Sequence, residues 1–301
     1  MTLDELIRSW FVQNKAIAGK MATYAGSPAV FLQTAPPDKQ PGWGHESQYP
    51  RIVNTIELRA DNERKSQGLL RVDLYCDLAK DSPEDIEPLI RSAMKDIVMQ
   101  PDDSSPYCFA WARTDGFELE SNNSDKRTDK RIAGYEVVFD IIEYPEQYAT
   151  YPDPCETMNL GLKEAFPDLF VIGVDQIDRF RVATEDEPIL YIRTDSISND
   201  HVSMALTWVN CTLAIHVIAP TASSRNKWVR CITNALMMCG EAAMPDESPL
   251  RFTDISATNR SDYLLTGQIT LKGQYTLPRI VTEGGTLRNI PQIRRSLNNG
   301  N

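Results

Sequence analysis

The side chains that most often bind metals or act as nucleophiles are few and scattered in this sequence. No two of its six cysteines form a Cys-x-x-Cys pair, and four of the six lie within apolar periodic segments. We therefore expect buried, reduced thiols rather than disulfides or a metal site. The cysteines are Cys76, Cys108, Cys155, Cys211, Cys231 and Cys239.

The three histidines, His45, His201 and His216, give a similarly weak signal for catalysis. None stands near a second type of ligand at the spacing of a metal site. His216 alternates with Ile215 and Val217 in an apolar segment, which favours a strand position over a catalytic or ligand role. No Walker loop, GxGxxG before a helix, HExxH or nucleophile elbow is present. We expect no enzyme activity, no catalytic residues, no cofactor and no metal.

Two short clusters have both a binding and a structural interpretation. The tip formed by Trp43, Gly44 and His45 lies in a loop rich in proline and glycine. It either anchors a neighbouring protein or packs back on its own domain. The acidic run Glu185–Glu187 favours a solvated turn before a strand over a cation site.

Charge and composition exclude some classes of protein. The 301 residues include 42 acidic and 31 basic side chains, and the net charge of −11 argues against tight or sequence-specific nucleic-acid binding. No apolar run reaches the ~18 residues of a membrane span. The start MTLDELIRSWF is amphipathic and carries acids, unlike a signal peptide. We expect a soluble chain that is neither in a membrane nor exported as a free polypeptide.

The first half of the chain predicts a strand pair covered by helices. Thr2 and Glu5 form a capping box for an amphipathic helix, and a loop rich in proline and glycine follows it to about Tyr49. Ser82 and Pro83 begin a second helix. The predicted elements are a helix from Leu3 to Gly19, a short apolar stretch at 30–32, strands over 52–58 and 70–78, a helix over 83–98 and a hairpin over 109–145. In the second strand one face is apolar, with Leu70, Val72, Leu74, Cys76 and Leu78.

The same order of elements begins again in the second half. A short helix at 160–166 precedes a strand in DEPILYIRTDSIS, and a further strand passes through a serine-containing cap into a helix. A hairpin with a much shorter tip follows, and the boundary between the halves falls at Pro152 and Pro154. Five elements in the same order indicate a duplicated domain. The apolar face of the second half's long helix is predicted to contain Trp228, Cys231, Ile232, Ala235, Leu236 and Cys239.

The predicted fold class is therefore α+β. We expect two tandem similar domains, each a mostly antiparallel sheet covered by helices, with a C-terminal arm. The domains are expected at 1–150 and 151–280, and the arm at 281–301.

This pattern of elements resembles the tail terminator proteins of long-tailed bacteriophages, also called tail completion or neck proteins. The resemblance spans residues 1–150 and, more loosely, 156–280, and the chain departs from the family's usual pattern by carrying two copies. The segments that carry it are the helix Leu3–Gly19, the stretch Thr34-Ala35-Pro36-Pro37 leading to Tyr49-Pro50-Arg51-Ile52-Val53, the strand Leu70–Leu78 and the helix 83–98 before Tyr135–Tyr144.

The resemblance implies a structural virion protein rather than an enzyme. Such a protein forms a homo-oligomeric ring, here of six or three chains, at the head-proximal end of the tail. The ring ends polymerisation of the tail tube protein and docks to the head–tail connector protein, while DNA passes through its lumen without specific binding. Its location would be the tail or neck of the virion, after assembly in the bacterial host cytoplasm. The alternatives are a head-completion or sheath-capping protein of the neck, or a two-domain module that binds a small molecule or peptide.

The C-terminal segment differs from the rest in charge. Residues 281–301 contain three arginines and one glutamate, whereas residues 1–150 contain 17 basic and 25 acidic side chains. The segment has few large apolar residues to offset its ordering entropy, so we expect an arm that pairs with acidic surface on an adjacent chain. The predicted interface residues are Trp43, His45, Arg288, Ile290, Ile293, Arg294 and Arg295.

Overall fold

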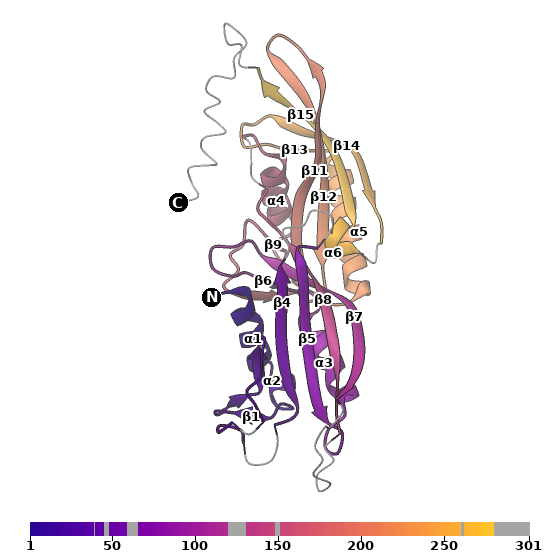
Figure 1. The fold of residues 1–301 in the computed structure, drawn as a ribbon. Coiled ribbons are helices and arrows are strands. Elements are labelled where there is room, and N and C mark those ends of the chain that lie inside the picture. The colour runs from indigo at the N-terminus through magenta and orange to yellow at the C-terminus, as the bar shows by residue number, and fades with distance from the viewer. Residues whose placement is uncertain are drawn as a thin grey trace, which may run out of the picture. The chain divides into compact units, whose positions relative to one another are not determined.

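The computed structural model describes residues 1–38, 40–44, 48–58, 66–119, 131–147, 151–259 and 262–279. It confirms the α+β class, with mostly antiparallel sheets and few helices. The chain divides into two compact units (Figure 1). Unit 1 contains residues 1–143 and 177–182, and unit 2 contains residues 144–176 and the described residues from 183 onward. The return of Ile177–Val182 to unit 1 was not predicted.

Unit 1 is built on a seven-stranded sheet with the strand order β10-β6-β7-β8-β5-β4-β3. Only β3 and β4 pair in parallel; all other neighbours are antiparallel. The helices of unit 1 are α1 (Leu3–Gln13), α2 (Lys15–Ala18) and α3 (Pro83–Met94). Its strands are β1 (Thr23–Tyr24), β2 (Ser27–Pro28), β3 (Val30–Leu32), β4 (Arg51–Leu58), β5 (Gly68–Asp77), β6 (Ile97–Met99), β7 (Tyr107–Leu119), β8 (Ile132–Glu143) and β10 (Phe180–Val182).

The N-terminal helix begins as predicted but ends earlier. The capping box between Thr2 and Glu5 is present at the start of α1. The predicted continuation to Gly19 is wrong, because the chain leaves helical geometry at Asn14, which has ψ 103°. The side chain of Asn14 accepts hydrogen bonds from the backbone of Ala16 and Ile17 and caps the separate helix α2.

One face of the sheet and its helices form the core of unit 1. The predicted apolar face of β5 is confirmed from Leu70 to Cys76, whereas Leu78 lies beyond the strand and is exposed. Helix α1 contacts β3 and β4, and α3 contacts β5, β7 and β8. Leu6 and Ile7 of α1 and Ile86 and Ile90 of α3 belong to the same buried cluster, so both helices cover one face of the sheet.

Helix α3 is shorter than predicted, and a strand follows it directly. The backbone leaves helical geometry at Lys95, which has ψ 132°. Asp96 then adopts a left-handed φ of 56°, and the chain turns into β6. The prediction that Ile97 extends the apolar stripe of a helix over 83–98 is therefore wrong. Ile97 is buried as a strand residue beside β7 and β10.

Unit 2 is built on a six-stranded sheet with the strand order β13-β14-β15-β12-β11-β9, in which only β9 and β11 are parallel. Its helices are α4 (Pro154–Ala165), α5 (Ala222–Cys239) and α6 (Tyr263–Thr266). Its strands are β9 (Phe170–Val171), β11 (Ile189–Val202), β12 (Leu206–Ile218), β13 (Glu241–Ala243), β14 (Pro249–Ala257) and β15 (Ile269–Pro278).

Two predictions for unit 2 need correction at its first helix and last hairpin. Helix α4 begins at Pro154, well before the predicted 160–166, because Asp153 caps it and Pro154 occupies its first turn. The same proline was interpreted as a breaker. The connection from 258 to 268 is nearly as long as the one from 120 to 131 and contains α6, so the predicted much shorter tip is wrong.

The buried face of α5 agrees with the predicted one only in part. Val229, Ile232 and Leu236 pack into the core of unit 2 together with residues of α4 and the sheet. Cys231 and Cys239, which were placed on the apolar face, are exposed. Of the predicted face, Ile232 and Leu236 are buried and Trp228 packs against the core, so the prediction is wrong at the two cysteines.

The two sheets share one strand order. In unit 1 the series β6-β7-β8-β5-β4-β3 runs across the sheet, and in unit 2 the series β13-β14-β15-β12-β11-β9 does so. In each series the last pair is parallel and the others are antiparallel. In each unit the chain passes from the long central strand, β5 or β12, into a core helix, α3 or α5, and then into the short first strand of the series, β6 or β13. Unit 1 carries one additional edge strand, β10.

Candidate functional site

Of the seven predicted interface residues, only Trp43 lies in the described part of the chain. The others lie outside the described residues: His45, Arg288, Ile290, Ile293, Arg294 and Arg295.

Trp43 packs within its own unit. Its ring lies edge-on to Tyr24 and Phe31, with centroid distances of 4.9 and 5.6 Å. Its Nε1 donates to the carbonyl of Pro37 at 3.1 Å, and the guanidinium of Arg51 lies 5.9 Å from the ring centroid. These contacts leave Trp43 half-buried. An interface role for the exposed part of the ring stays a prediction.

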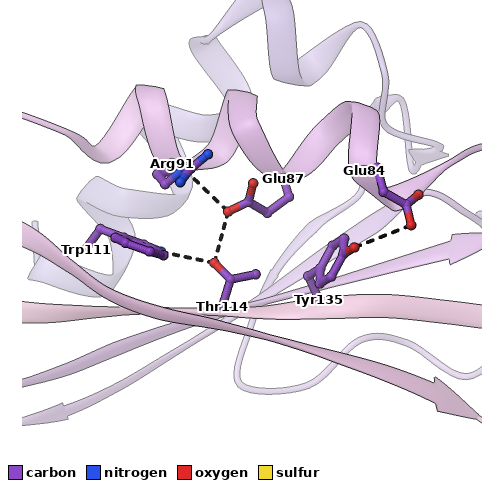
Figure 2. A pocket seen from close by; sticks show the side chains of 6 residues that line it. All are labelled: Glu84, Glu87, Arg91, Trp111, Thr114 and Tyr135. Atoms are coloured by element: carbon purple, nitrogen blue, oxygen red, sulfur yellow. Dashed lines mark hydrogen bonds and ion pairs between the residues drawn. The ribbon is translucent and has the colours of Figure 1, made fainter.

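A pocket of about 280 Å³ lies on unit 1 where α3 crosses β7 and β8 (Figure 2). Residues of α3 three and four positions apart share one side of the helix, so Glu84, Glu87 and Arg91 form one wall. Trp111 and Thr114 come from β7 and Tyr135 from β8. A bulge between Trp111 and Arg113 changes the register of β7 here, and bulges commonly redirect side chains.

Hydrogen bonds and a stacking contact link the walls of this pocket. Trp111 Nε1 donates to Thr114 Oγ1 at 3.0 Å, and Thr114 Oγ1 donates to Glu87 Oε1 at 3.0 Å (Figure 2). Arg91 Nε lies 3.6 Å from Glu87 Oε1, and the guanidinium of Arg91 lies 5.2 Å from the centroid of the Trp111 ring. The side chains of Glu87 and Arg91 are therefore held in place before any ligand arrives.

The second carboxylate of the pocket lacks a cationic partner. Tyr135 donates its hydroxyl to Glu84 Oε1 at 3.4 Å, and the Ser82 hydroxyl also hydrogen-bonds to Glu84. These bonds, led by that from Ser82, hold the pKa of Glu84 below its usual value, so it is a carboxylate at neutral pH. Among the described residues no lysine, arginine or histidine forms an ion pair with it. The pocket is suited to binding a cation between aromatic walls.

The pocket was not predicted from the sequence. The acids of DSPEDIE were interpreted only as favourable charges at a helix start, and FAWARTDGFELE only as a strand. A signal was present, because Trp111 is a large aromatic in a strand segment rich in polar residues. It is 49% exposed in the structure, and exposed tryptophans are enriched at protein interfaces.

A second candidate surface is the distal part of the hairpin formed by β11 and β12. From Asp195 to Val202 every residue of β11 is exposed. Ile197 is 55% exposed and Met204, in the turn, is 89% exposed. Arg279, just after β15, donates from Nη1 to the carbonyl of Ser203 at 2.7 Å and so holds the turn. This ordered hairpin presents apolar side chains to solvent, which favours an interface.

His216 lies in a buried cluster of unit 2. Its Nε2 accepts a hydrogen bond from Arg193 at 3.2 Å, and its Nδ1 contacts the carbonyl of Tyr263 at 2.9 Å. Burial, and next the charge of Arg193, lower the pKa of His216 to about 4. The imidazole is neutral and carries its proton on Nδ1. These contacts give His216 a structural role, in line with the strand position that the sequence favoured.

All six cysteines are free thiols, and four are buried. Burial raises the pKa of Cys76 and Cys155 to about 12 and that of Cys211 to about 11, which makes these thiols poor nucleophiles. Within the described ranges, no three side chains of His, Cys, Asp or Glu lie close enough together to hold a metal ion.

Comparisons with known proteins identify no family for this chain. No protein-family model matches the sequence, and no curated protein gives a significant match. The helices of the described residues include none that is long and apolar enough to cross a membrane.

Proposed function

We propose that this protein is a tail terminator of a long-tailed bacteriophage, a structural virion protein with a duplicated domain. It would form a ring of six or three chains at the head-proximal end of the tail, end polymerisation of the tail tube protein and present the docking surface for the head–tail connector. The observation that carries the proposal is the element order of the units: helix, strands, core helix and hairpin, the pattern on which the resemblance rests.

The shared strand order supports the duplication. A six-strand series with one parallel pair at the same end has many alternative orders, so independent origin of two matching series is improbable. In both units the core helix also follows the fourth strand of the series, β5 or β12, along the chain. A duplicated ring subunit places two pseudo-equivalent domains in each chain, which is why both six and three chains agree with the proposal.

Surface features support a role in assembly. A ring subunit needs two different faces, each complementary to the other on its neighbour. Unit 1 presents the pocket beside the exposed Trp111, and unit 2 presents the ordered hairpin with Ile197 and Met204. The net charge of −11 suits a lumen through which DNA passes without binding, and it also keeps the free subunit dispersed.

The proposal is tested by deleting the gene in a phage that carries it. We expect heads and tails that remain unjoined, with tails of irregular length in electron micrographs. Expression of the chain in trans should restore joined particles with tails of normal length, whereas normal particles in the deletion strain would refute the proposal. Labelled chain should be found between tube and connector; a position on the head or sheath indicates one of the neighbouring neck proteins instead.

The mass of the purified chain separates this proposal from the two-domain binding module. A ring component assembles into a closed oligomer alone or when tail tubes are added. A binding module remains a monomer or dimer under both conditions, and that result would favour the alternative.

A further inference from the structure

The acid-rich start of α3 gives the pocket of unit 1 a net negative charge. Residues 81–87 include Asp81, Glu84, Asp85 and Glu87 and no basic residue. Arg91 is already engaged by Glu87 and by the Trp111 ring. The pocket therefore has room for a further cation, with Glu84 as its counter-ion and the rings of Trp111 and Tyr135 beside it.

An open backbone edge lies next to this pocket. In the described residues, β6 pairs with β7 only at Tyr107 and Cys108. The remainder of β7, from Phe109 to Leu119, has β8 on one side and no strand of the described residues on the other. Such an edge accepts an extended segment through main-chain hydrogen bonds, while adjacent pockets bind its side chains. A ligand for this site is thus an extended peptide that carries a basic side chain.

The sequence contains a segment of this kind. Residues 281–301 have a net charge of +2 and include the adjacent pair Arg294 and Arg295 after Ile293. The segment follows Arg279, whose backbone N–H and side chain both bond to the turn of the β11–β12 hairpin. Residues 280–301 span about 70 Å when extended, which is enough to reach a neighbouring subunit.

We propose that the pocket between α3 and β7–β8 binds an arginine of segment 281–301 from a second copy of this chain. The segment runs along the open edge of β7, and Arg294 or Arg295 pairs with Glu84 between Tyr135 and Trp111. This inference rests on the proposed ring assembly and identifies one of its contacts. Charge complementarity selects the occupant, because the pocket is net negative and this segment is net positive in an acidic protein.

The test reverses the charge on one side of the contact at a time, in the full-length chain. Glu84→Arg and the pair Arg294→Glu/Arg295→Glu should each raise the concentration needed for half-maximal assembly by about tenfold, measured by sedimentation velocity. Glu84→Gln should give a smaller effect in the same direction. Glu84 is exposed but lies in the first turn of α3, so the dispersed Glu84 variants should remain folded and melt only slightly below the wild type. Glu164→Arg, an exposed acid on α4, and Asn298→Asp/Asn299→Asp are the matched controls and should assemble like the wild type.

Mixing the two variants shows whether the contact joins two copies. Chains with Glu84→Arg and chains with Arg294→Glu/Arg295→Glu are each defective alone. In an equimolar mixture a pocket of one variant can meet an arm of opposite charge on the other, at every contact of an alternating six-chain ring and at two of the three contacts of a three-chain ring. Assembly should therefore recover, fully or in part, toward the wild-type concentration. A contact within one chain is not repaired by mixing, and absence of recovery would overturn the proposal.

Failure of the pocket contact can be distinguished from failure of the proposed function. If the wild-type chain stays monomeric even on tail tubes, the ring itself is refuted. If the wild type forms rings and all charge variants form them equally well, the ring stands and the pocket contact is overturned.

Discussion

His216 is surrounded by groups that favour its neutral form. Arg193 donates to its Nε2, and the rings of Tyr144 and Tyr191 lie 5.7 and 5.5 Å from the imidazole centroid. A proton on Nε2 would face the positive charge of Arg193 in a site without water access. The folded state therefore resists protonation well below the ordinary pKa of 6.5.

This resistance predicts a loss of stability in acid. His216 binds its proton near pH 6.5 in the unfolded chain and only near pH 4 in the folded chain. The contribution of neutral His216 to the unfolding free energy is therefore complete above pH 6.5 and is lost as pH falls toward 4. Between pH 7 and 4.5 the wild type should lose roughly 2 kcal/mol more unfolding free energy than His216→Asn, as measured by denaturant titration. An NMR titration that finds the imidazole of His216 protonating near pH 6.5 would contradict the prediction.

The cysteines predict a simple labelling pattern. Cys231 and Cys239 are exposed, and the other four thiols are buried with raised pKa values. A thiol reagent should modify two groups rapidly in the native chain and six after unfolding. In Cys231→Ser/Cys239→Ser no rapid modification should remain. Rapid reaction of a third thiol would show that the core is open where the structure has it closed.

At the scale of elements, Gly134 determines how closely β5, β7 and β8 pack. It lies opposite Tyr75 on β5 and Phe117 on β7, whose rings meet at a centroid distance of 5.1 Å. A Cβ on Gly134 would lie 1.7 Å from the carbonyl oxygen of Leu74 and 2.8 Å from the Phe117 ring. The backbone of Leu74 and the ring of Phe117 thus occupy the space that a side chain at 134 would need.

Gly134→Ala should therefore destabilise unit 1 by roughly 2 kcal/mol, because the strands must separate to admit the methyl group. Gly161→Ala is the matched control: it lies in α4, and no atom lies within 4 Å of the added Cβ. That change should stabilise the chain by roughly 0.5–1 kcal/mol through helix propensity. Thermal unfolding of both variants checks the pair, and equal melting temperatures would exclude the close packing at Gly134.

At the scale of the whole molecule, the two units are not two consecutive halves of the chain. Strand β10 follows α4 and β9 of unit 2 in sequence but pairs with β6 of unit 1. Its Phe180 contacts Trp10 of α1 at a centroid distance of 5.0 Å. A fragment cut at residue 150, where the sequence predicted the domain boundary, would lack this strand.

Phe180→Ala should consequently destabilise unit 1 although it lies in the second half of the sequence. We expect a loss of roughly 1–2 kcal/mol, because the ring is only partly buried. Val182→Ala, at an exposed position of the same strand, is the control and should have little effect. Unfolding can be followed by hydrogen exchange in β6 and α1, and unchanged protection there would contradict the assignment of β10 to this sheet.

The sequence by itself determined what depends on neighbouring residues. The capping box at Thr2 and the alternation from Leu70 to Cys76 were predicted and are present, because each depends on backbone geometry within a few residues. The α+β class followed from such local patterns. They did not determine where a pattern ends, and the helix predicted to Gly19 stops at Asn14.

Only the tertiary structure decided which elements meet. The pocket combines Glu84, Glu87 and Arg91 with Trp111 and Tyr135, which lie on three elements separated by long stretches of chain. The choice of buried residues on α5 and the pairing of β10 with β6 likewise depend on partners distant in sequence. Burial and strand pairing are long-range interactions, and many local patterns are compatible with more than one partner. The sequence predicted the elements, and their contacts formed the site.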